Sequence, residues 1–273
     1  MKKAPDIFSN FKTLKIPLFF LFWVWKKIKD PLYDRGWLTF LWNNRKRITS
    51  FAENEIIMEN FTKDKSLVLR GEGNSDWKVF NQVIIQREYD EVLDFVESTI
   101  GGRRLLFFDC GANIGLAAHA IHTRFQNTIS IGVEPSKENL KLASQNADYE
   151  VLHNAVLHSS SNCRFKIDDP SKESYAFSFS EDKEGDIVSL DLETLSRAIT
   201  PGTYAFLKLD IEGAETEIIE NASIDLLERF DLIAIEFHEA ISNATPSKKK
   251  LKSSGFQHFM SGEYDVYYKT PSD

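Results

Sequence analysis

A short stretch of the sequence, FFDCGANIG (107–115), has the residue types and spacing of a site for a nucleotide-like molecule. Asp109 ends an apolar run, Gly111 can take the positive φ of a sharp turn, and Gly115 lets the following helix pack close to a sheet. Such a turn is expected to present free backbone N–H groups at the positive end of a helix, which suits a carboxylate or a phosphate. The stretch therefore predicts a nucleotide-like cofactor.

The spacing within this turn separates the cofactor classes. Dinucleotide sites use G-x-G-x-x-G, in which the second glycine lets the backbone approach a pyrophosphate, and Asn113 stands at that position here. S-adenosylmethionine has no phosphate and needs a less close approach. Its amino-acid end can hydrogen-bond to the turn, with Asp109 near its ammonium or sulfonium charge. We therefore expect S-adenosylmethionine, and a nucleotide-dependent oxidoreductase of Rossmann type is the alternative enzyme class.

Two further strand ends complete the predicted cofactor site. Glu134 ends the next apolar run, 25 residues after Asp109, where a carboxylate can accept both hydroxyl protons of a ribose. The small Ala155 in HNAV (153–156) would leave room for an adenine ring. The predicted cofactor-binding residues are Asp109, Gly111, Ala112, Asn113, Gly115, Glu134, Pro135, Asn154, Ala155 and Asp210.

The stretch LKLDIEGAE (207–215) carries carboxylates at a predicted strand end. An extended backbone would aim Asp210 and Glu212 at the same face, and the carboxyl ends of strands in open α/β sheets face the ligand crevice. Glu215 falls in the first turn of the next helix, where a negative charge is favoured. The alternative is that Glu212 and Glu215 only cap this helix.

If S-adenosylmethionine is the cofactor and the acceptor is a hydroxyl group, methyl transfer needs an aligned acceptor oxygen and a base that removes its proton. His238 follows the apolar run LIAIEF (232–237), and the unperturbed pKa of a histidine is near 6.5, so we expect His238 to be this base. A hydrogen-bonded histidine at a strand end is the alternative. Asp210 is the competing base and Glu236 a third, so the predicted catalytic residues are His238 and Asp210.

Patterns of metal ligands are weak in this sequence. Asp210, Glu212 and Glu236 could supply oxygen ligands, but no tight cluster of the required spacing is visible, so we expect no metal. His119 and His122 lie three residues apart on a predicted helix with no third ligand nearby, which favours packing or a helix surface.

Around these motifs the chain alternates apolar runs with helical patterns, which is typical of a largely parallel sheet with helices on both faces. The predicted strands are 105–109, 129–134, 149–153, 186–190, 204–210 and 232–238, and the predicted helices are 115–124, 136–147, 191–199 and 213–229, the last with a break near Asn221. Ser136 and Asp191 are fair N-caps. FQHFM and YDVYYK, on either side of Ser261-Gly262-Glu263, predict an antiparallel hairpin at the sheet edge.

Two polar segments lie between these elements. Residues 168–185 are acidic and rich in serine, which indicates a solvated loop or, alternatively, a lid in which Tyr175 and its aromatic neighbours cover a ligand. Residues 242–254 carry a run of lysines and are expected to form a solvated face.

Composition and charge bound the setting and the partners. Two cysteines in 273 residues cannot make a disulfide framework, which indicates a reducing, cytoplasmic location. Residues 1–47 hold eleven Lys or Arg and three Asp, a net charge of +8, whereas the rest of the chain sums to −16. The acidic body is a poor partner for nucleic acid, so only the basic arm is expected to meet an anionic surface.

The arm contains KIPLFFLFWVWKKIK (15–29), in which residues 16–25 are uncharged. These ten residues are too few to span a bilayer, and no small-residue cleavage site follows them as in a signal peptide. Tryptophan favours the membrane–water boundary and lysine favours anionic head groups, so residues 12–29 are predicted to anchor the protein peripherally on the cytoplasmic membrane face. Docking of the arm on the protein's own core or on a second subunit is the alternative.

The motifs FFDCGANIG, GVEPSKENLKLA, HNAV, VSLDLETL and LKLDIEGAETEII, in this order, make the sequence similar to the FkbM family of S-adenosylmethionine-dependent methyltransferases. The upstream WKVFNQVIIQREYDEV (77–92) resembles the opening segment of that family, so the resemblance covers roughly residues 76–240. It implies a seven-stranded class I methyltransferase fold, with methyl transfer to hydroxyl groups of sugars or polyketide-type natural products. It also implies that Tyr89 contacts the cofactor or the acceptor. Cys110 departs mildly from the aliphatic residue often found there.

We therefore expect a basic amphipathic arm at 1–47, a lead-in of helix and strand at 48–103, and an S-adenosylmethionine-binding α/β domain at 104–273. The expected activity is O-methylation of a hydroxyl of a glycan or lipid-linked saccharide. The alternatives are a polyketide-type or other small acceptor and a non-catalytic cofactor-binding protein of the same fold. The predicted substrate contacts are Tyr89, Glu212 and Tyr175.

Overall fold

The structure is a computed structural model that describes residues 48–51, 55–62, 65–70, 75–167 and 179–269. The chain forms two compact units, Met1–Glu72 and Gly73–Asp273. The described residues of the first unit form an antiparallel sheet in the order β1-β2-β3. Its strands are β1 (Ile48–Phe51), β2 (Glu55–Thr62) and β3 (Lys65–Arg70).

The predicted membrane anchor at 12–29 lies outside the described residues. Among the helices that the structure does describe, none is long and apolar enough to cross a membrane.

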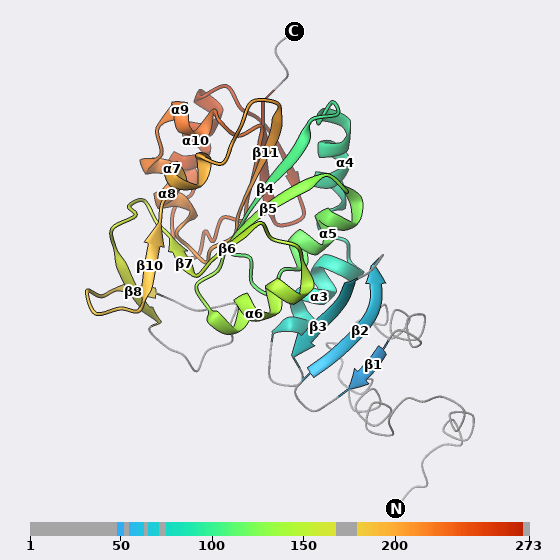
Figure 1. The fold of residues 1–273 in the computed structure, drawn as a ribbon. Coiled ribbons are helices and arrows are strands. Elements are labelled where there is room, and N and C mark those ends of the chain that lie inside the picture. The colour runs from blue at the N-terminus through green and yellow to red at the C-terminus, as the bar shows by residue number, and fades with distance from the viewer. Residues whose placement is uncertain (1–47, 52–54, 63–64, 71–74, 168–178, 270–273) are drawn as a thin grey trace, which may run out of the picture. The chain divides into compact units, whose positions relative to one another are not determined.

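The second unit is built on a seven-stranded sheet in the order β13-β14-β12-β11-β4-β5-β6 (Figure 1). Strands β12, β11, β4, β5 and β6 are parallel, whereas β14 pairs antiparallel with both β12 and β13. The strands are β4 (Arg104–Cys110), β5 (Thr128–Val133), β6 (Val151–His153), β11 (Thr203–Leu209), β12 (Leu232–Ile235), β13 (Gln257–Ser261) and β14 (Tyr264–Tyr268). This arrangement confirms the predicted, mostly parallel sheet with its antiparallel C-terminal hairpin.

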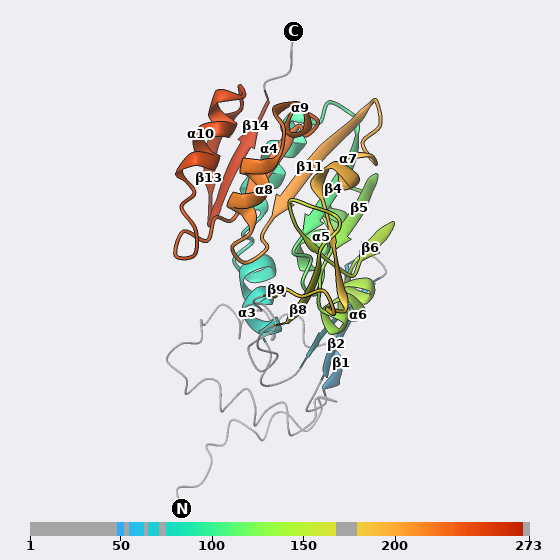
Figure 2. The ribbon, with the colours of Figure 1, turned by 90° about the vertical axis from the view of Figure 1, so that its left-hand side faces the viewer.

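Helices cover both faces of this sheet, with α4 and α5 on one side and α8, α9 and α10 on the other (Figures 1 and 2). Because both faces are covered, every residue of β4 after Arg104 is buried, and β4 reads as a continuous apolar run that ends in an acid and a cysteine. The helices are α3 (Asp76–Phe80), the π-helix η2 (Asn81–Ile85), α4 (Asp90–Thr99), α5 (Leu116–Arg124), α6 (Lys137–Asn146), α7 (Leu192–Ser196), α8 (Glu215–Asn221), α9 (Ile224–Leu227) and α10 (Thr245–Ser253).

The predicted helix boundaries are confirmed where local chemistry sets them. The side chains of Ser136 and Asp191 each accept a hydrogen bond from the backbone N–H three residues on, at 3.3 and 2.7 Å. The predicted helix at 213–229 breaks after Asn221 into α8 and α9. The lysine-rich segment expected only as a solvated face contains α10.

One predicted strand belongs to a different sheet. The segment 186–190 forms β10 (Ile187–Leu190), which lies in a separate four-stranded sheet of order β7-β10-β8-β9 rather than in the main sheet. Its burial alternates, with Ile187 buried and Val188 47% exposed, as in a strand that has one solvated face. The partners are β7 (Ala155–Leu157), β8 (Arg164–Ile167) and β9 (Phe179–Glu181), and β9 falls within the segment predicted to be a loop.

Candidate functional site

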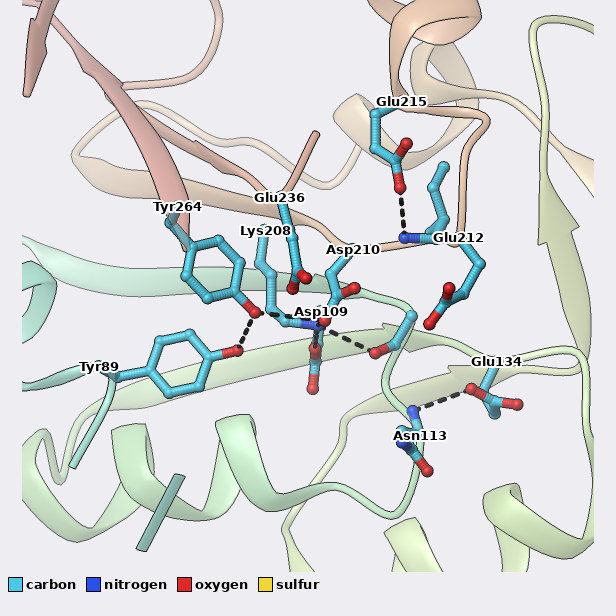
Figure 3. Close-up of polar contacts among 12 residues, drawn as sticks. Tyr89, Asp109, Asn113, Glu134, Lys208, Asp210, Glu212, Glu215, Glu236 and Tyr264 are labelled. Carbon is cyan, nitrogen blue, oxygen red and sulfur yellow. Dashed lines mark hydrogen bonds and ion pairs between the residues drawn. The ribbon is translucent and has the colours of Figure 1, made fainter. Parts of the chain in front are cut away.

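Acidic side chains and one lysine gather at the carboxyl ends of β4, β5, β11 and β12 (Figure 3). Ligands of open α/β sheets bind at the carboxyl ends of the strands, so the sequence analysis expected the site at this edge. The predicted site residues meet there. Asp109, Lys208, Asp210 and Glu236 lie close together there, and Glu134 lies to one side, next to Asn113.

The glycine turn after β4 is formed by two close backbone contacts. Gly111 has a φ of +80°, and a Cβ atom there would lie 1.7 Å from the carbonyl oxygen of Asp210, so the chain ends of β4 and β11 meet where only glycine fits. At Gly115 a Cβ atom would lie 2.9 Å from Cα of Ala143 in α6. The close approach that Gly115 allows is therefore one of α5 to α6, whereas the sequence analysis assigned it to the sheet, which α5 also covers.

The backbone N–H groups of the turn bond within the protein. Those of Gly111 and Ala112 both donate to the carbonyl of Val133, each at 3.0 Å, and that of Asn113 donates to Glu134 Oε2 at 2.9 Å. The prediction that the turn presents free N–H groups is therefore wrong for these three residues. The reason is that the turn continues the pairing of β4 with β5, and this pairing satisfies its donors.

A buried lysine in β11, Lys208, lies under the turn. Its Nζ donates to the carbonyl of Gly111 at 2.9 Å and lies 3.3 Å from Asp109 Oδ1 and 3.4 Å from Asp210 Oδ2. Tyr149 donates to Asp109 Oδ2 at 2.7 Å. Burial raises the pKa of Asp109, and although burial opposes the charge of Lys208, the acidic groups around it keep the pKa of Lys208 well above its usual value. Asp109 is therefore a fully buried partner of Lys208 behind the turn.

Glu134 follows β5 and is buried. Its carboxylate accepts hydrogen bonds from the N–H groups of Asn113 and Ser136, both at 2.9 Å, and from the amide of Asn139 at 3.2 Å. Burial raises the pKa of Glu134 to about 7. A carboxylate offers about four lone-pair positions, and these hydrogen bonds use all but about one of them. The predicted contact with both hydroxyl groups of a ribose required two positions.

A cavity of about 440 Å³, the large cavity, lies between the turn, the end of β5 and the four-stranded sheet. The predicted cofactor residues that line it are Gly111, Asn113, Glu134, Pro135, Ala155 and Asp210. Those that do not are Asp109, Ala112, Gly115 and Asn154. Asn154 instead supports the strand ends, because its amide donates to the carbonyls of Glu134 and Pro135 at 3.3 and 2.6 Å.

The sequence analysis missed the part of the large cavity that the four-stranded sheet supplies. Leu157, His158 and Phe165 line it. The rings of His158 and Phe165 are in contact, with centroids 5.2 Å apart, and His158 Nε2 lies 3.4 Å from Glu217 Oε1. Apolar residues at 157 and 165 could have been a signal, but only the pairing of β10 with both β7 and β8 brings them together.

A second cavity of about 110 Å³, the small cavity, shares four lining residues with the large one. The shared residues are Gly111, Asn113, Asp210 and Glu212. Tyr89 also lines the small cavity, and its hydroxyl lies 2.7 Å from that of Tyr264, which donates to Asp210 Oδ2 at 3.2 Å. The structure thus brings Tyr89 and Glu212, two of the predicted substrate contacts, to one cavity. Tyr175, the third, lies outside the described residues.

Three carboxylates of the small cavity, Glu88, Glu212 and Glu236, hold protons more strongly than usual. Burial, reinforced by neighbouring acids, raises the pKa of Glu88 and of Glu212 to about 7 and that of Glu236 to about 8. Glu263 also lines this cavity. Near neutral pH the three groups with a raised pKa are therefore partly protonated and can exchange protons with a ligand.

His238 is surrounded by carboxylates. Its Nδ1 lies 3.0 Å from Glu215 Oε1, and its Nε2 lies 3.4 Å from Glu212 and 3.8 Å from Glu236. The hydrogen bond to Glu215 and the charges of the other two acids raise the pKa of His238 to about 9. His238 lines neither cavity. The assumption of an ordinary histidine pKa is therefore wrong, because the charge of His238 depends on acids that only the fold brings near it.

The sequence analysis expected no metal because it found no tight cluster of ligands, but the fold does bring such a cluster together. Asp210, Glu236 and His238 each offer a ligand atom within 4.8 Å of the others, a cluster that the sequence did not reveal. A protonated imidazole donates and does not coordinate, so the absence of a metal stays a prediction. His119 Nδ1 contacts the carbonyl of Asn146 at 2.8 Å and His122 contacts Ser130 at 2.7 Å, which confirms packing roles for both.

The chain was compared with protein-family models, curated proteins and solved structures. The sequence model of a family described as "Methyltransferase FkbM domain" matches residues 109–258. No curated protein matches the sequence. Among solved structures, DesVI of Streptomyces venezuelae is 10% identical over 67% of this chain and 91% of that one, with a TM-score of 0.40. The magnesium protoporphyrin IX methyltransferase of Synechocystis PCC 6803 with bound SAH is 11% identical over 68% and 83% of the two chains, with a TM-score of 0.37.

Proposed function

This chain belongs to the FkbM methyltransferase family, and we propose that it transfers the methyl group of S-adenosylmethionine to a hydroxyl group of a glycan or lipid-linked saccharide. Its enzyme class and its cofactor follow from the family. The fold is the class I methyltransferase fold, with seven strands and an antiparallel hairpin at one edge. The acceptor is the part that we propose.

The residues of the large cavity fit the cofactor. Its volume of about 440 Å³ suits a nucleoside-sized molecule, and Glu134 keeps about one acceptor position that we assign to a ribose hydroxyl. Ala155 and Leu157 offer apolar surface for an adenine ring. Asp210 and Glu212 place negative charge at the border with the small cavity, where it would stabilise a sulfonium. When bound, S-adenosylmethionine supplies a methyl carbon already activated for displacement.

The observation that carries the choice of acceptor is the chemistry of the small cavity. It is lined by carboxylates, which accept hydrogen bonds from hydroxyl groups and repel anions. These are Glu88, Asp210, Glu212, Glu236 and Glu263. Lys208, one of the lysines that line the cavity, is already paired with Asp109 and Asp210, so its positive charge is neutralised within the protein. We therefore expect a neutral sugar hydroxyl and not a carboxylate or phosphate as the methylated group.

A labelled-methyl transfer assay tests this function. The full chain is incubated with methyl-labelled S-adenosylmethionine and a glycan array, with lipid-linked saccharides and polyketides as parallel acceptors. We expect label on saccharide hydroxyls. Preferential labelling of a polyketide would overturn the glycan assignment, and cofactor binding without label on any acceptor would indicate a binding protein of the same fold.

We also propose that the acceptor is lipid-linked and that the protein lies peripherally on the cytoplasmic membrane face. This proposal rests on the tryptophans and lysines of residues 12–29. Deletion of residues 1–30 is expected to release the protein from anionic vesicles in a sedimentation assay. Unchanged sedimentation would contradict a membrane role of the arm and favour its docking on protein.

A further inference from the structure

The carboxylates of the small cavity differ in how fully they are occupied. Asp210 accepts a hydrogen bond from Tyr264 and lies 3.4 Å from Lys208, so its carboxylate already has two partners. Glu236, directly after β12, has a side chain that is 26% exposed, and its nearest charged partner is His238 at 3.8 Å. Within the described part of the chain, the Glu236 carboxylate accepts no hydrogen bond. In the same described residues Glu88, Glu212 and Glu263 accept no side-chain hydrogen bond either. Glu236 differs from Glu88 and Glu263 because the cation of His238 lies beside it. It differs from Glu212 because it lines the small cavity alone and does not border the large one.

We propose that Glu236 is the general base that removes the proton of the acceptor hydroxyl, and that His238 is a positioning residue that acts through Glu236. This proposal rests on the proposed function. The sequence analysis expected His238 to be the base. We assign that role to Glu236 instead, because Glu236 lines the small cavity and His238 lines neither cavity. Figure 3 shows the Glu236 carboxylate beside Asp210 and on the same side of the sheet edge as Tyr264.

The chemical step balances with this base. The acceptor oxygen forms a bond to the methyl carbon while the carbon–sulfur bond breaks and its electron pair returns to sulfur. The hydroxyl proton passes to a carboxylate oxygen of Glu236, which becomes neutral and later loses the proton to water. The products are a methyl ether and S-adenosylhomocysteine, whose thioether sulfur is uncharged.

The surroundings adjust Glu236 for this task. Burial raises its pKa to about 8, the charges of Asp210 and Glu263 raise it further, and those of His238 and Lys208 oppose them. A base is most effective when its pKa lies near the working pH. His238, with a pKa near 9, is a cation below that pH and keeps Glu236 from binding its proton too tightly. Burial also raises the pKa of two other acids that line the cavity, Glu88 and Glu212, to about 7.

A titration of the free protein tests the proposal without an acceptor. In the full chain with carbon-13 glutamate, NMR should show a carboxyl that titrates near pH 8 and is missing in Glu236→Gln. Its midpoint should rise by about half a unit or more in His238→Gln and fall in Glu263→Gln, because one change removes a cation and the other an anion. The proposal is overturned if the Glu236 carboxyl titrates as an ordinary glutamate, or if neither variant moves it.

The rate of methyl transfer to a pool of methyl glycosides gives the second readout. We expect kcat to rise with pH to a plateau with a midpoint near 8, and Glu236→Gln to lower kcat by about 10²-fold or more while S-adenosylhomocysteine affinity by calorimetry stays unchanged. Glu236→Asp should recover part of the rate, and His238→Gln should move the midpoint upward. Glu239→Gln, the same charge change at an exposed residue that pairs with Lys248, is the matched control and should behave as wild type.

The outcomes separate this proposal from the proposed function. If wild-type protein methylates none of the glycosides, the glycan assignment fails, and the titration still decides the state of Glu236. If wild-type protein is active and Glu236→Gln keeps its rate and its pH midpoint, Glu236 is not the base.

Discussion

The contact between Gly111 and the end of β11 is open to a direct test with Gly111→Ala. The added Cβ would lie 1.7 Å from the carbonyl oxygen of Asp210 and 2.8 Å from its carbonyl carbon. Both are backbone atoms that cannot rotate away, so the turn and the segment from Asp210 to Glu212 must separate. Gly202 is the matched control, because it has a similar φ of +83° but a Cβ there would meet no atom within 4 Å.

The two variants differ by the cost of the contact alone. Each places alanine in the left-handed region, which costs about 1–2 kcal/mol. Gly111→Ala adds the cost of overpacking, about 1–3 kcal/mol, so it should lose about 2–5 kcal/mol of the free energy of unfolding in total. For a domain of this size the control should lower Tm by about 2–8 °C and Gly111→Ala by about 4–20 °C.

Binding gives a second, independent readout. Because Gly111, Asp210 and Glu212 line both cavities, Gly111→Ala should weaken S-adenosylhomocysteine binding by about tenfold or more in calorimetry, or about 1.4 kcal/mol, whereas Gly202→Ala should not. Equal losses of stability together with equal affinities in the two variants would refute the close contact as the reason for a glycine at 111.

The remaining predictions concern charge. Glu134→Gln should weaken S-adenosylhomocysteine binding and cost about 1–3 kcal/mol of stability, since an amide NH₂ cannot accept the backbone donors that the carboxylate binds; calorimetry and urea unfolding check this. Lys208→Met should cost about 3–5 kcal/mol because Asp109 stays buried without its cation, and adding Asp109→Asn should recover part of that loss in the same unfolding assay. Stability should fall as pH rises from about 5 to 9. The pKa of Glu134 and of Glu212 is raised to about 7, so the folded protein loses stability relative to the unfolded chain between about pH 4.5 and 7. The pKa of His238 is raised to about 9, so the stability that its charge contributes is fully present below about pH 6.5 and is lost as the pH rises through 9. Urea unfolding at three pH values across that range, with no such decline, would contradict these shifts. Methyl transfer should be insensitive to EDTA, whereas loss of activity restored by Mg²⁺ would show that a metal is required.

Short-range patterns were sufficient for the strands and the turn of this site. The apolar run before Asp109 and the positive φ of Gly111 and Gly115 are local features, and the predicted elements around them are present. The atoms that a side chain at 111 or 115 would meet belong to distant segments, which local patterns do not reveal. The strand 186–190 shows the limit of such patterns. A run of apolar residues indicates a strand, but its alternating burial and its pairing with β7 and β8 depend on segments distant in the sequence.

The charge states of the site were beyond local patterns. His238 acquires its raised pKa from Glu215, Glu212 and Glu236, which come from two different segments. Lys208 was missed although the sequence carried a readable signal for it. A lysine inside a nearly continuous apolar strand is almost never buried unless it is paired, so its position between Leu207 and Leu209 already implied a buried acid nearby.

A crystal structure of the full chain with S-adenosylhomocysteine tests the central claim most directly. The account predicts the ligand in the large cavity, with its ribose at Glu134, its adenine against Ala155 and Leu157, and its sulfur at the border formed by Asp210 and Glu212, facing the small cavity. A ligand bound elsewhere, or one whose sulfur points away from that border, would contradict the claim that methyl transfer occurs between the two cavities.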